Sequence, residues 1–207
     1  MLRAISATAV TFLLALSAGS ATAAEEIGAV SRTQGMSSGN VEGKIEMLRI
    51  DSSVFHQEIV STGTSSRLEI TFADGTQLTL GEKAEMTLDR FVYDPASGTG
   101  ELKLGIVGAF RFISGQASKM ANADVTVTTP VATVGIRGTD FWGGPIDDQF
   151  GVLLIEGAVS VSNAAGEQVL DTPGEGTNIA APGAAPGNVT FWPQDKVTRA
   201  FATVTFQ

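Results

Sequence analysis

Apolar and polar residues alternate with a period of two along most of the chain. Leu68, Ile70 and Phe72 are separated by single polar residues, and Leu78 and Leu80 repeat the pattern a few positions later. This alternation is typical of strands with one buried face. Turn-forming residues recur about every ten positions, a spacing that favours many short strands. The pattern predicts an all-β domain, arranged as a β-sandwich, a roll or a short solenoid-like domain.

The first clear hairpin has Ala73-Asp74-Gly75 between its two alternating runs. A two-residue Asp-Gly turn would place the two apolar sets on opposite faces. A three-residue loop instead pairs Ile70 with Leu78 and Leu68 with Leu80 on one face. The buried face sets the register, so we predict the three-residue loop, with Gly75 in the left-handed position of a bulge.

Further strands are expected wherever the alternation resumes. Residues 152–155 differ, because they form a continuous apolar run that predicts a strand buried on both faces. The other expected strands cover 88–93, 102–106 with 110–112 on the same face, 125–127, 131–134, 159–162 and 169–170.

The end of the chain has a different pattern. Residues 179–188 are rich in Ala, Pro and Gly and predict an extended connector. Val197, Ala200, Phe201 and Val204 then follow a helical spacing, which predicts a short C-terminal helix. Residues 189–207 are expected to cap the β domain, and a helix that binds a partner is the alternative.

The beginning of the chain has the order of a secretory signal peptide. Arg3 precedes a short apolar stretch, and Ala21-Thr22-Ala23-Ala24 follows as a cleavage site. A membrane anchor is the alternative, but polar and small residues interrupt the stretch before it reaches about 20 apolar residues. We expect residues 1–24 to be removed, leaving 25–178 as the β domain and a mature form without a transmembrane span.

Composition excludes several classes of function. Removing Arg3 changes the net charge from −9 to −10, and such an acidic chain repels the phosphates of nucleic acids. The chain has no cysteine, so disulfides and thiolate ligands are excluded. No cofactor and no metal site is predicted.

Candidate catalytic groups are few. His56 is the only histidine, and its place beside a predicted strand favours an ordinary strand-edge residue. A hydrolase could use carboxylates such as Asp140, Asp147, Asp148 and Glu156. The Asp147-Asp148 pair is more typical of a solvated turn, so we expect no enzyme, and a hydrolase is the weakest alternative.

The middle of the chain contains the most specific motifs. Residues 128–141 read TTPVATVGIRGTDF, and residues 152–161 read VLLIEGAVSV. Upstream, residues 59–66 read IVSTGTSS and residues 72–80 read FADGTQLTL. Together these segments, from about Ile59 to Gly176, resemble the FecR domain family. The resemblance implies a β-rich periplasmic domain.

The resemblance also has a limit. Known FecR regulators have a cytoplasmic end that controls an extracytoplasmic sigma factor, whereas this sequence predicts a cleaved signal and no cytoplasmic part. We therefore expect a non-enzymatic binding or sensing module in the periplasm, or outside the cell. Its partner would be a periplasmic or envelope protein, or an envelope glycan. A structural or assembly component of the cell envelope is the alternative.

Two interpretations of the 128–141 motif remain open. Gly135 and Gly138 flank Ile136-Arg137, which predicts a tight corner where Arg137 binds backbone carbonyls or Asp140 in a structural role. Alternatively, Arg137, Asp140 and Trp142 form a recognition surface. Trp142 lies before two glycines, which fits an exposed binding loop, and a core position is equally compatible.

Overall fold

The computed structural model describes residues 25–207. Within that range the chain forms sixteen strands, one short 3₁₀ helix and one α-helix. The strands are β1 (Glu26–Gln34), β2 (Ser37–Val41), β3 (Lys44–Met47), β4 (Ser53–Phe55), β5 (Ile59–Thr62), β6 (Arg67–Phe72), β7 (Gln77–Leu80), β8 (Glu85–Asp94), β9 (Thr99–Val107), β10 (Phe110–Ile113), β11 (Asn122–Thr128), β12 (Thr133–Ile146), β13 (Gln149–Asn163), β14 (Gly166–Leu170), β15 (Glu175–Ile179) and β16 (Thr190–Phe191). The helices are η1 (Ala117–Lys119) and α1 (Gln194–Ala202).

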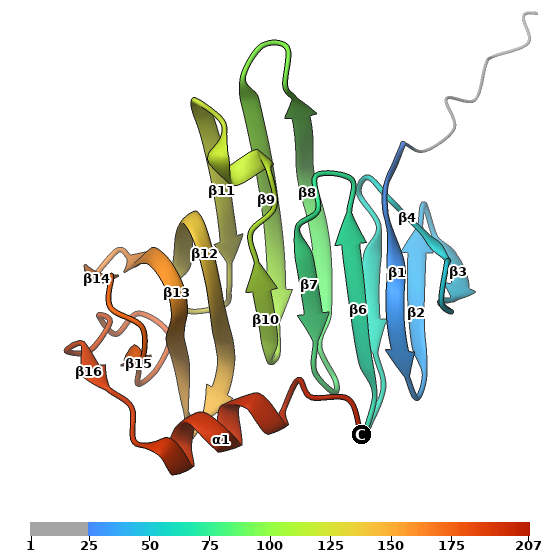
Figure 1. The fold of residues 1–207 in the computed structure, drawn as a ribbon. Coiled ribbons are helices and arrows are strands. Elements are labelled where there is room, and N and C mark those ends of the chain that lie inside the picture. The colour runs from blue at the N-terminus through green and yellow to red at the C-terminus, as the bar shows by residue number, and fades with distance from the viewer. Residues whose placement is uncertain (1–24) are drawn as a thin grey trace, which may run out of the picture.

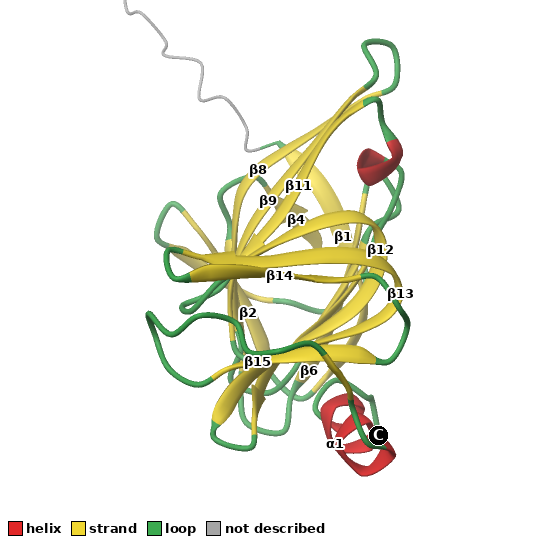
Figure 2. Ribbon diagram, turned by 90° about the vertical axis from the view of Figure 1, so that its left-hand side faces the viewer, coloured by secondary structure: helices red, strands yellow, loops and turns green. Residues whose placement is uncertain are grey.

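The strands form one continuous, curled sheet (Figures 1 and 2). Its main path runs β3-β2-β5-β8-β9-β11-β12-β10-β7-β6-β1-β4, and β13 to β16 extend it beside β12. Most neighbours are antiparallel, and β9 with β11 is a parallel pair. The predicted all-β fold with a short C-terminal helix is therefore confirmed, and the curled sheet has the form of a roll.

The long β12–β13 hairpin lies between two halves of this sheet. One half is β3-β2-β5-β8-β9-β11, and the other is β10-β7-β6-β1-β4. The first part of β12 pairs with β11, and its last part pairs with β10. Similarly, β13 pairs with β15 at its beginning and with β14 at its end. The hairpin thus passes from one half to the other, as strands do at the corners of packed sheets, where a bulge permits the bend.

One hydrophobic core fills the space between the halves. It contains Leu68, Ile70, Leu78 and Leu80 from the first hairpin, together with apolar side chains of β8, β9, β11 and β12. Leu68 pairs with Leu80 and Ile70 with Leu78, and Gly75 has a φ of +83°. The three-residue loop and its register are confirmed, because only that register directs both apolar sets into the core.

A second, smaller apolar cluster covers the outer face of β12 and β13. Trp142 and Leu153 lie there against Trp192, Ala200 and Val204 of the C-terminal segment. The helix α1 runs along the lower side of the sheet in Figure 1, and it provides part of this cover. Because Val152 and Leu154 lie in the main core and Leu153 lies in this cluster, the expected strand with two buried faces is confirmed.

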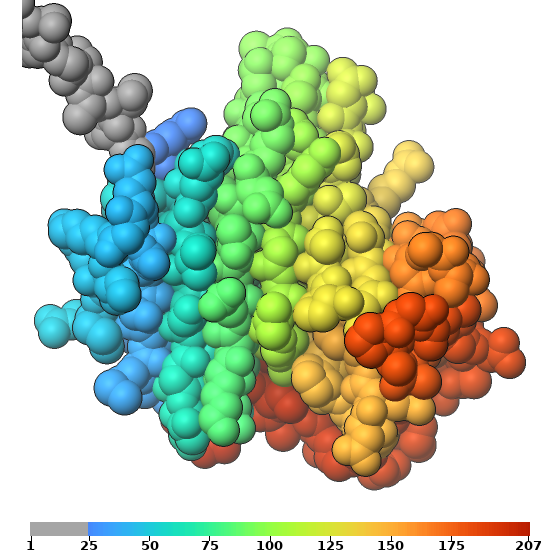
Figure 3. Space-filling view, turned by 180° about the vertical axis from the view of Figure 1, so that it is seen from behind, coloured from blue at the N-terminus to red at the C-terminus, as the bar shows by residue number. Residues whose placement is uncertain are grey.

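The surface shows the same order of segments as the ribbon. In Figure 3 the first strands lie on the left and the later strands on the right, and the C-terminal residues extend along the lower side. Between β15 and β16, residues 180–189 form neither helix nor strand. The predicted signal peptide lies outside the described residues. None of the helices within 25–207 has the length and apolarity needed to cross a membrane.

Candidate functional site

The motif that contains Arg137 lies inside β12. The pairing of β12 with β13 shifts between Arg137 and Asp140, and Gly138 there has a φ of +61°. Opposite it, a Cβ on Gly157 would lie only 2.2 Å from the Gly138 carbonyl oxygen. The predicted tight corner is therefore wrong in form. The strand continues through the motif, and a bulge that requires Gly138 and Gly157 bends the hairpin.

Two threonines of the motif, Thr129 and Thr139, are buried and hydrogen-bonded. The Thr129 hydroxyl donates to the Ala132 carbonyl at 2.9 Å and accepts the Ala132 N–H at 3.1 Å, which fixes the turn before β12. The Thr139 hydroxyl donates to the Ala158 carbonyl at 2.7 Å, which ties the bulge to β13. These two threonines stabilise the fold, since buried hydroxyls need partners.

The Asp74-Gly75-Thr76 loop fixes the position of η1, the second segment of the site. The buried Asp74 carboxylate accepts the Thr76 N–H and the Ala117 N–H, each at 3.0 Å. The Thr76 hydroxyl in turn accepts the Gly115 N–H at 3.0 Å. Asp74 therefore positions the first residue of η1, so two motifs far apart in sequence fix one local structure.

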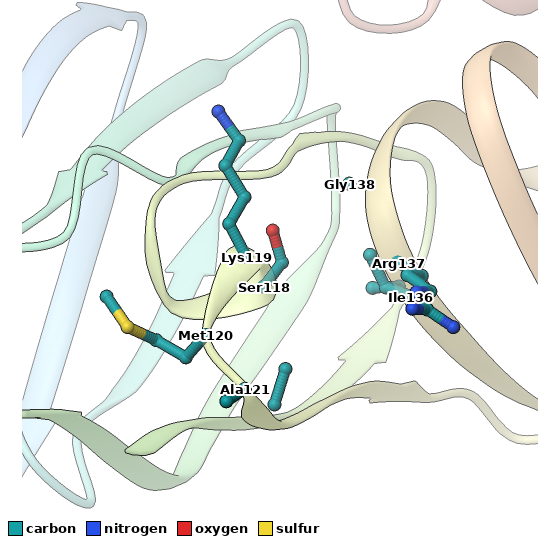
Figure 4. A pocket seen from close by; sticks show the side chains of 8 residues that line it. Ser118, Lys119, Met120, Ala121, Ile136, Arg137 and Gly138 are labelled. Atoms are coloured by element: carbon teal, nitrogen blue, oxygen red, sulfur yellow. The ribbon is translucent and has the colours of Figure 1, made fainter. Parts of the chain in front are cut away.

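A cleft of about 440 Å³ lies between η1 and the bulge of β12. Ser118, Lys119 and Met120 line one side, and Ile136 and Arg137 line the other (Figure 4). Lys119 and Arg137 are both exposed. Within residues 25–207 neither side chain forms an ion pair. Two free cations beside one cleft can attract a carboxylate or another anion.

The structural role expected for Arg137 is therefore wrong, because its guanidinium binds neither backbone carbonyls nor Asp140. Asp140 instead forms a two-pronged ion pair with Arg111 of β10, with N–O distances of 2.9 and 2.6 Å. This pair links β12 to β10, and hydrogen bonding to Asp140 raises the pKa of Arg111. Asp140 thus stabilises the pairing of β12 with β10. Its role in binding stays a prediction, and its position in the structure does not support that role.

Trp142 lies in the second apolar cluster. Its side chain is completely buried, and its indole N–H donates to the Thr203 hydroxyl at 3.0 Å. Its ring lies 6.0 Å from the ring of Trp192, edge to face. An exposed binding loop at Trp142 is therefore wrong, because the glycines after it serve close packing: a Cβ on Gly143 would lie 2.7 Å from the Phe110 ring.

The candidate catalytic carboxylates do not form a free pair. Asp140 and Glu156 are opposite each other on β12 and β13, but Arg111 binds the Asp140 carboxylate. Asp147 lies in the turn after β12, where an ion pair with Arg199 lowers its pKa. In the described part of the chain no cluster of three His, Cys, Asp or Glu side chains could hold a metal ion.

Sequence reasoning found Arg137 but missed Lys119, the other cation of the cleft. Lys119 follows a buried Ala117 and Ser118 in a segment without alternation or family motif. The signal that could have identified it is indirect, because Asp74 fixes η1 through a hydrogen bond across 43 residues of sequence.

Comparison with known proteins agrees with these motifs. The FecR protein family model matches residues 58–160, which includes the Asp74 loop, β12 and most of β13. The chain therefore carries a FecR domain over these residues. No curated protein matches it.

Two solved structures share the fold. Both are crystal structures of a candidate anti-sigma factor from Parabacteroides distasonis, at 19% and 20% identity with a TM-score of 0.54 for each. Each match covers 68% of this chain and 62% of the solved chain. This chain therefore spans less than two thirds of the length of those proteins, and the likeness shows the fold.

Proposed function

We propose that this chain is a non-enzymatic binding module of envelope signalling, exported to the periplasm, which contacts a protein partner through the Lys119–Arg137 cleft. The likeness to anti-sigma factors supports a regulatory setting, since regulators of that class act by binding other proteins. The partner should present a carboxylate or an acidic segment to the two cations.

The exposure of the Arg137 side chain is the observation that carries this proposal. Thr129, Thr139 and Phe141 of the same motif are buried, and both threonine hydroxyls are hydrogen-bonded within the fold. Arg137 is the exposed charged residue of the motif, and it has no ion-pair partner among residues 25–207. A charged side chain that the fold does not use, held at a bend that the fold stabilises, is suited to binding.

Pull-down from periplasmic extract tests the cleft. Arg137→Ala and Lys119→Ala should each weaken capture of the partner by about tenfold, the loss of one charge-assisted hydrogen bond. Both variants should melt like the parent, because neither side chain has a partner within the fold. Arg90→Ala is the matched control, since Arg90 is an exposed arginine bound to Glu101 and does not line the cleft.

A different result would overturn the proposal. Capture that is equal for the parent, Arg137→Ala and Lys119→Ala would show that the partner binds elsewhere. A large loss of stability in Arg137→Ala would instead restore the structural role.

Export is the second part of the proposal. The order of charge, apolar stretch and cleavage site in residues 1–24 supports it. Cell fractionation followed by N-terminal sequencing should find a periplasmic form that begins after Ala23 or Ala24. A membrane-embedded product that retains Met1 would show that the segment is an anchor.

A further inference from the structure

The curled sheet does not close on itself. Its main path ends at β3 on one side and at β4 on the other, and each of these strands has one paired edge within residues 25–207. A groove of about 740 Å³ lies between them, and it shares no lining residue with the Lys119–Arg137 cleft. Lys44 and Glu46 of β3 line one side, and Ser53 and Phe55 of β4 line the other.

A buried carboxylate faces this groove. Glu58 is 3% exposed and lines the groove, and its Oε2 accepts the Phe55 N–H at 2.8 Å. Its Oε1 lies over Gly39, where a Cβ would come within 1.7 Å, and has no hydrogen-bond donor among residues 25–207. Burial raises the pKa of Glu58, and the nearby Glu46 raises it further. A buried carboxylate of this kind is stabilised by a cation that enters the groove.

The charges around the groove also favour a cation. Glu42, Glu46 and Glu58 line it together with Lys44, so three carboxylates face one ammonium. Lys44 is already paired with Glu46. A divalent metal ion is a poor occupant, since it needs several oxygen ligands and the described residues hold no cluster of three candidate ligands.

The edge strand β3 also exposes two apolar side chains. All four of its residues are exposed, with Ile45 70% and Met47 55% accessible. Ile45 and Met47 alternate with Lys44 and Glu46, so the charged pair lies on the groove face. Met47 also lines the groove at the end of β3, whereas Ile45 does not. An extended chain can add to such an edge by main-chain hydrogen bonds, with its alternate side chains setting specificity.

We propose that the groove between β3 and β4 binds an extended segment of a partner protein, which adds to β3 as a strand and places a lysine or arginine side chain against Glu58. The flanking residues of that segment would be apolar and would cover Ile45 and Met47. A second copy of this chain is a weaker occupant. Antiparallel pairing of β3 with itself about Ile45 would match each Lys44 to a Glu46 and leave Glu58 without a cation.

The proposal is tested by NMR titration of the ¹⁵N-labelled protein with a blocked peptide, acetyl-Thr-Thr-Val-Lys-Val-Thr-Thr-amide. We expect amide shifts in β3, and about tenfold weaker binding when Gln replaces the peptide lysine or in the Glu58→Gln variant. The side-chain carbonyl in Glu58→Gln can still accept the Phe55 N–H, so this variant should stay folded. Glu167→Gln is the matched control, with the same change in charge at an exposed site on β14.

The outcomes separate this inference from the proposed function. Arg137→Ala should leave peptide binding unchanged. A negative result for the cleft therefore does not decide whether the groove binds a peptide, and the reverse also holds. Equal binding of the lysine and glutamine peptides, or unchanged affinity in Glu58→Gln, would overturn the groove proposal. An absence of shifts in β3 would do the same. Concentration-dependent dimerisation that protects the β3 amides would show that a second copy occupies the edge.

Discussion

At the scale of single residues, two glycines with the same φ of +83° have different surroundings. Nothing lies within 4 Å of a Cβ built on Gly75, whereas a Cβ on Gly157 would meet the backbone of Gly138 and Thr139. Gly75→Ala should therefore lower the free energy of unfolding by about 1–2 kcal/mol, from left-handed strain alone. Gly157→Ala should lower it by about 3 kcal/mol, because overpacking adds to the strain. Urea denaturation measures both, and equal losses would contradict the bulge geometry.

The Arg111–Asp140 pair should stabilise the sheet measurably. Its side chains are 34% and 13% exposed, and the contact is bidentate. A double-mutant cycle with Arg111→Ala and Asp140→Ala should give a coupling energy of about 1 kcal/mol. The same cycle on Lys44 and Glu46 is the control. Those side chains are 79% and 64% exposed, so their coupling energy should be near zero. Equal coupling energies in the two cycles would show that the Arg111–Asp140 pair does not stabilise the sheet more than an exposed pair does.

Glu58 should make stability depend on pH. Burial raises its pKa in the fold above the value of an unfolded chain, so its protonated form is favoured in the folded state. Its contribution is fully present below the unfolded carboxyl pKa and is lost as pH rises through the folded pKa. Glu58→Gln should therefore have a higher denaturation midpoint than the parent at neutral pH, and the difference should shrink in acid. If the difference between the two denaturation midpoints instead grows in acid, folding does not raise the pKa of Glu58.

At the scale of elements, α1 is a cover for β12 and β13. Both tryptophans of the chain lie in the cluster beneath it, so tryptophan fluorescence reports on this contact alone. Ala200 is completely buried in the cluster. Ala200→Glu should shift the emission to longer wavelength and lower the melting temperature, because a buried charge has no partner there. Ala202→Glu, the same change at an exposed position of α1, should do neither.

The elements also show what sequence patterns can predict. Period-two alternation identified β6, β7 and β9 and fixed the register of the first hairpin, because one face of each strand is buried. The continuity of β12 through Gly135-Ile136-Arg137-Gly138 was not predictable. Glycines indicate a bend, but whether the chain turns back or bulges within a strand depends on the pairing with β13.

The same limit applies to the candidate site. The family motif located Arg137, but its exposure depends on where the bulge directs it. Trp142 was ambiguous because only the docking of a segment 50 residues later, with Trp192 and Thr203, covers it. Lys119 and Glu58 had no local pattern, since their environments come from contacts between distant strands and loops.

At the scale of the whole molecule, the sheet carries two separate hollows. The Lys119–Arg137 cleft lies where the long hairpin bends, and the groove with Glu58 lies between β3 and β4. The cleft presents positive charge and the groove presents negative charge. We propose that a protein partner binds in the cleft, which is built on the FecR motif.

Site-specific photo-crosslinking in intact cells tests that claim most directly. A photoreactive amino acid in place of Met120, which lines the cleft, should yield one light-dependent adduct with a partner protein. That adduct should disappear when Arg137→Ala is added, and the same probe at the remote Glu167 should yield none. If position 120 gives no adduct, or gives the same adduct with and without Arg137, the cleft is not the binding site.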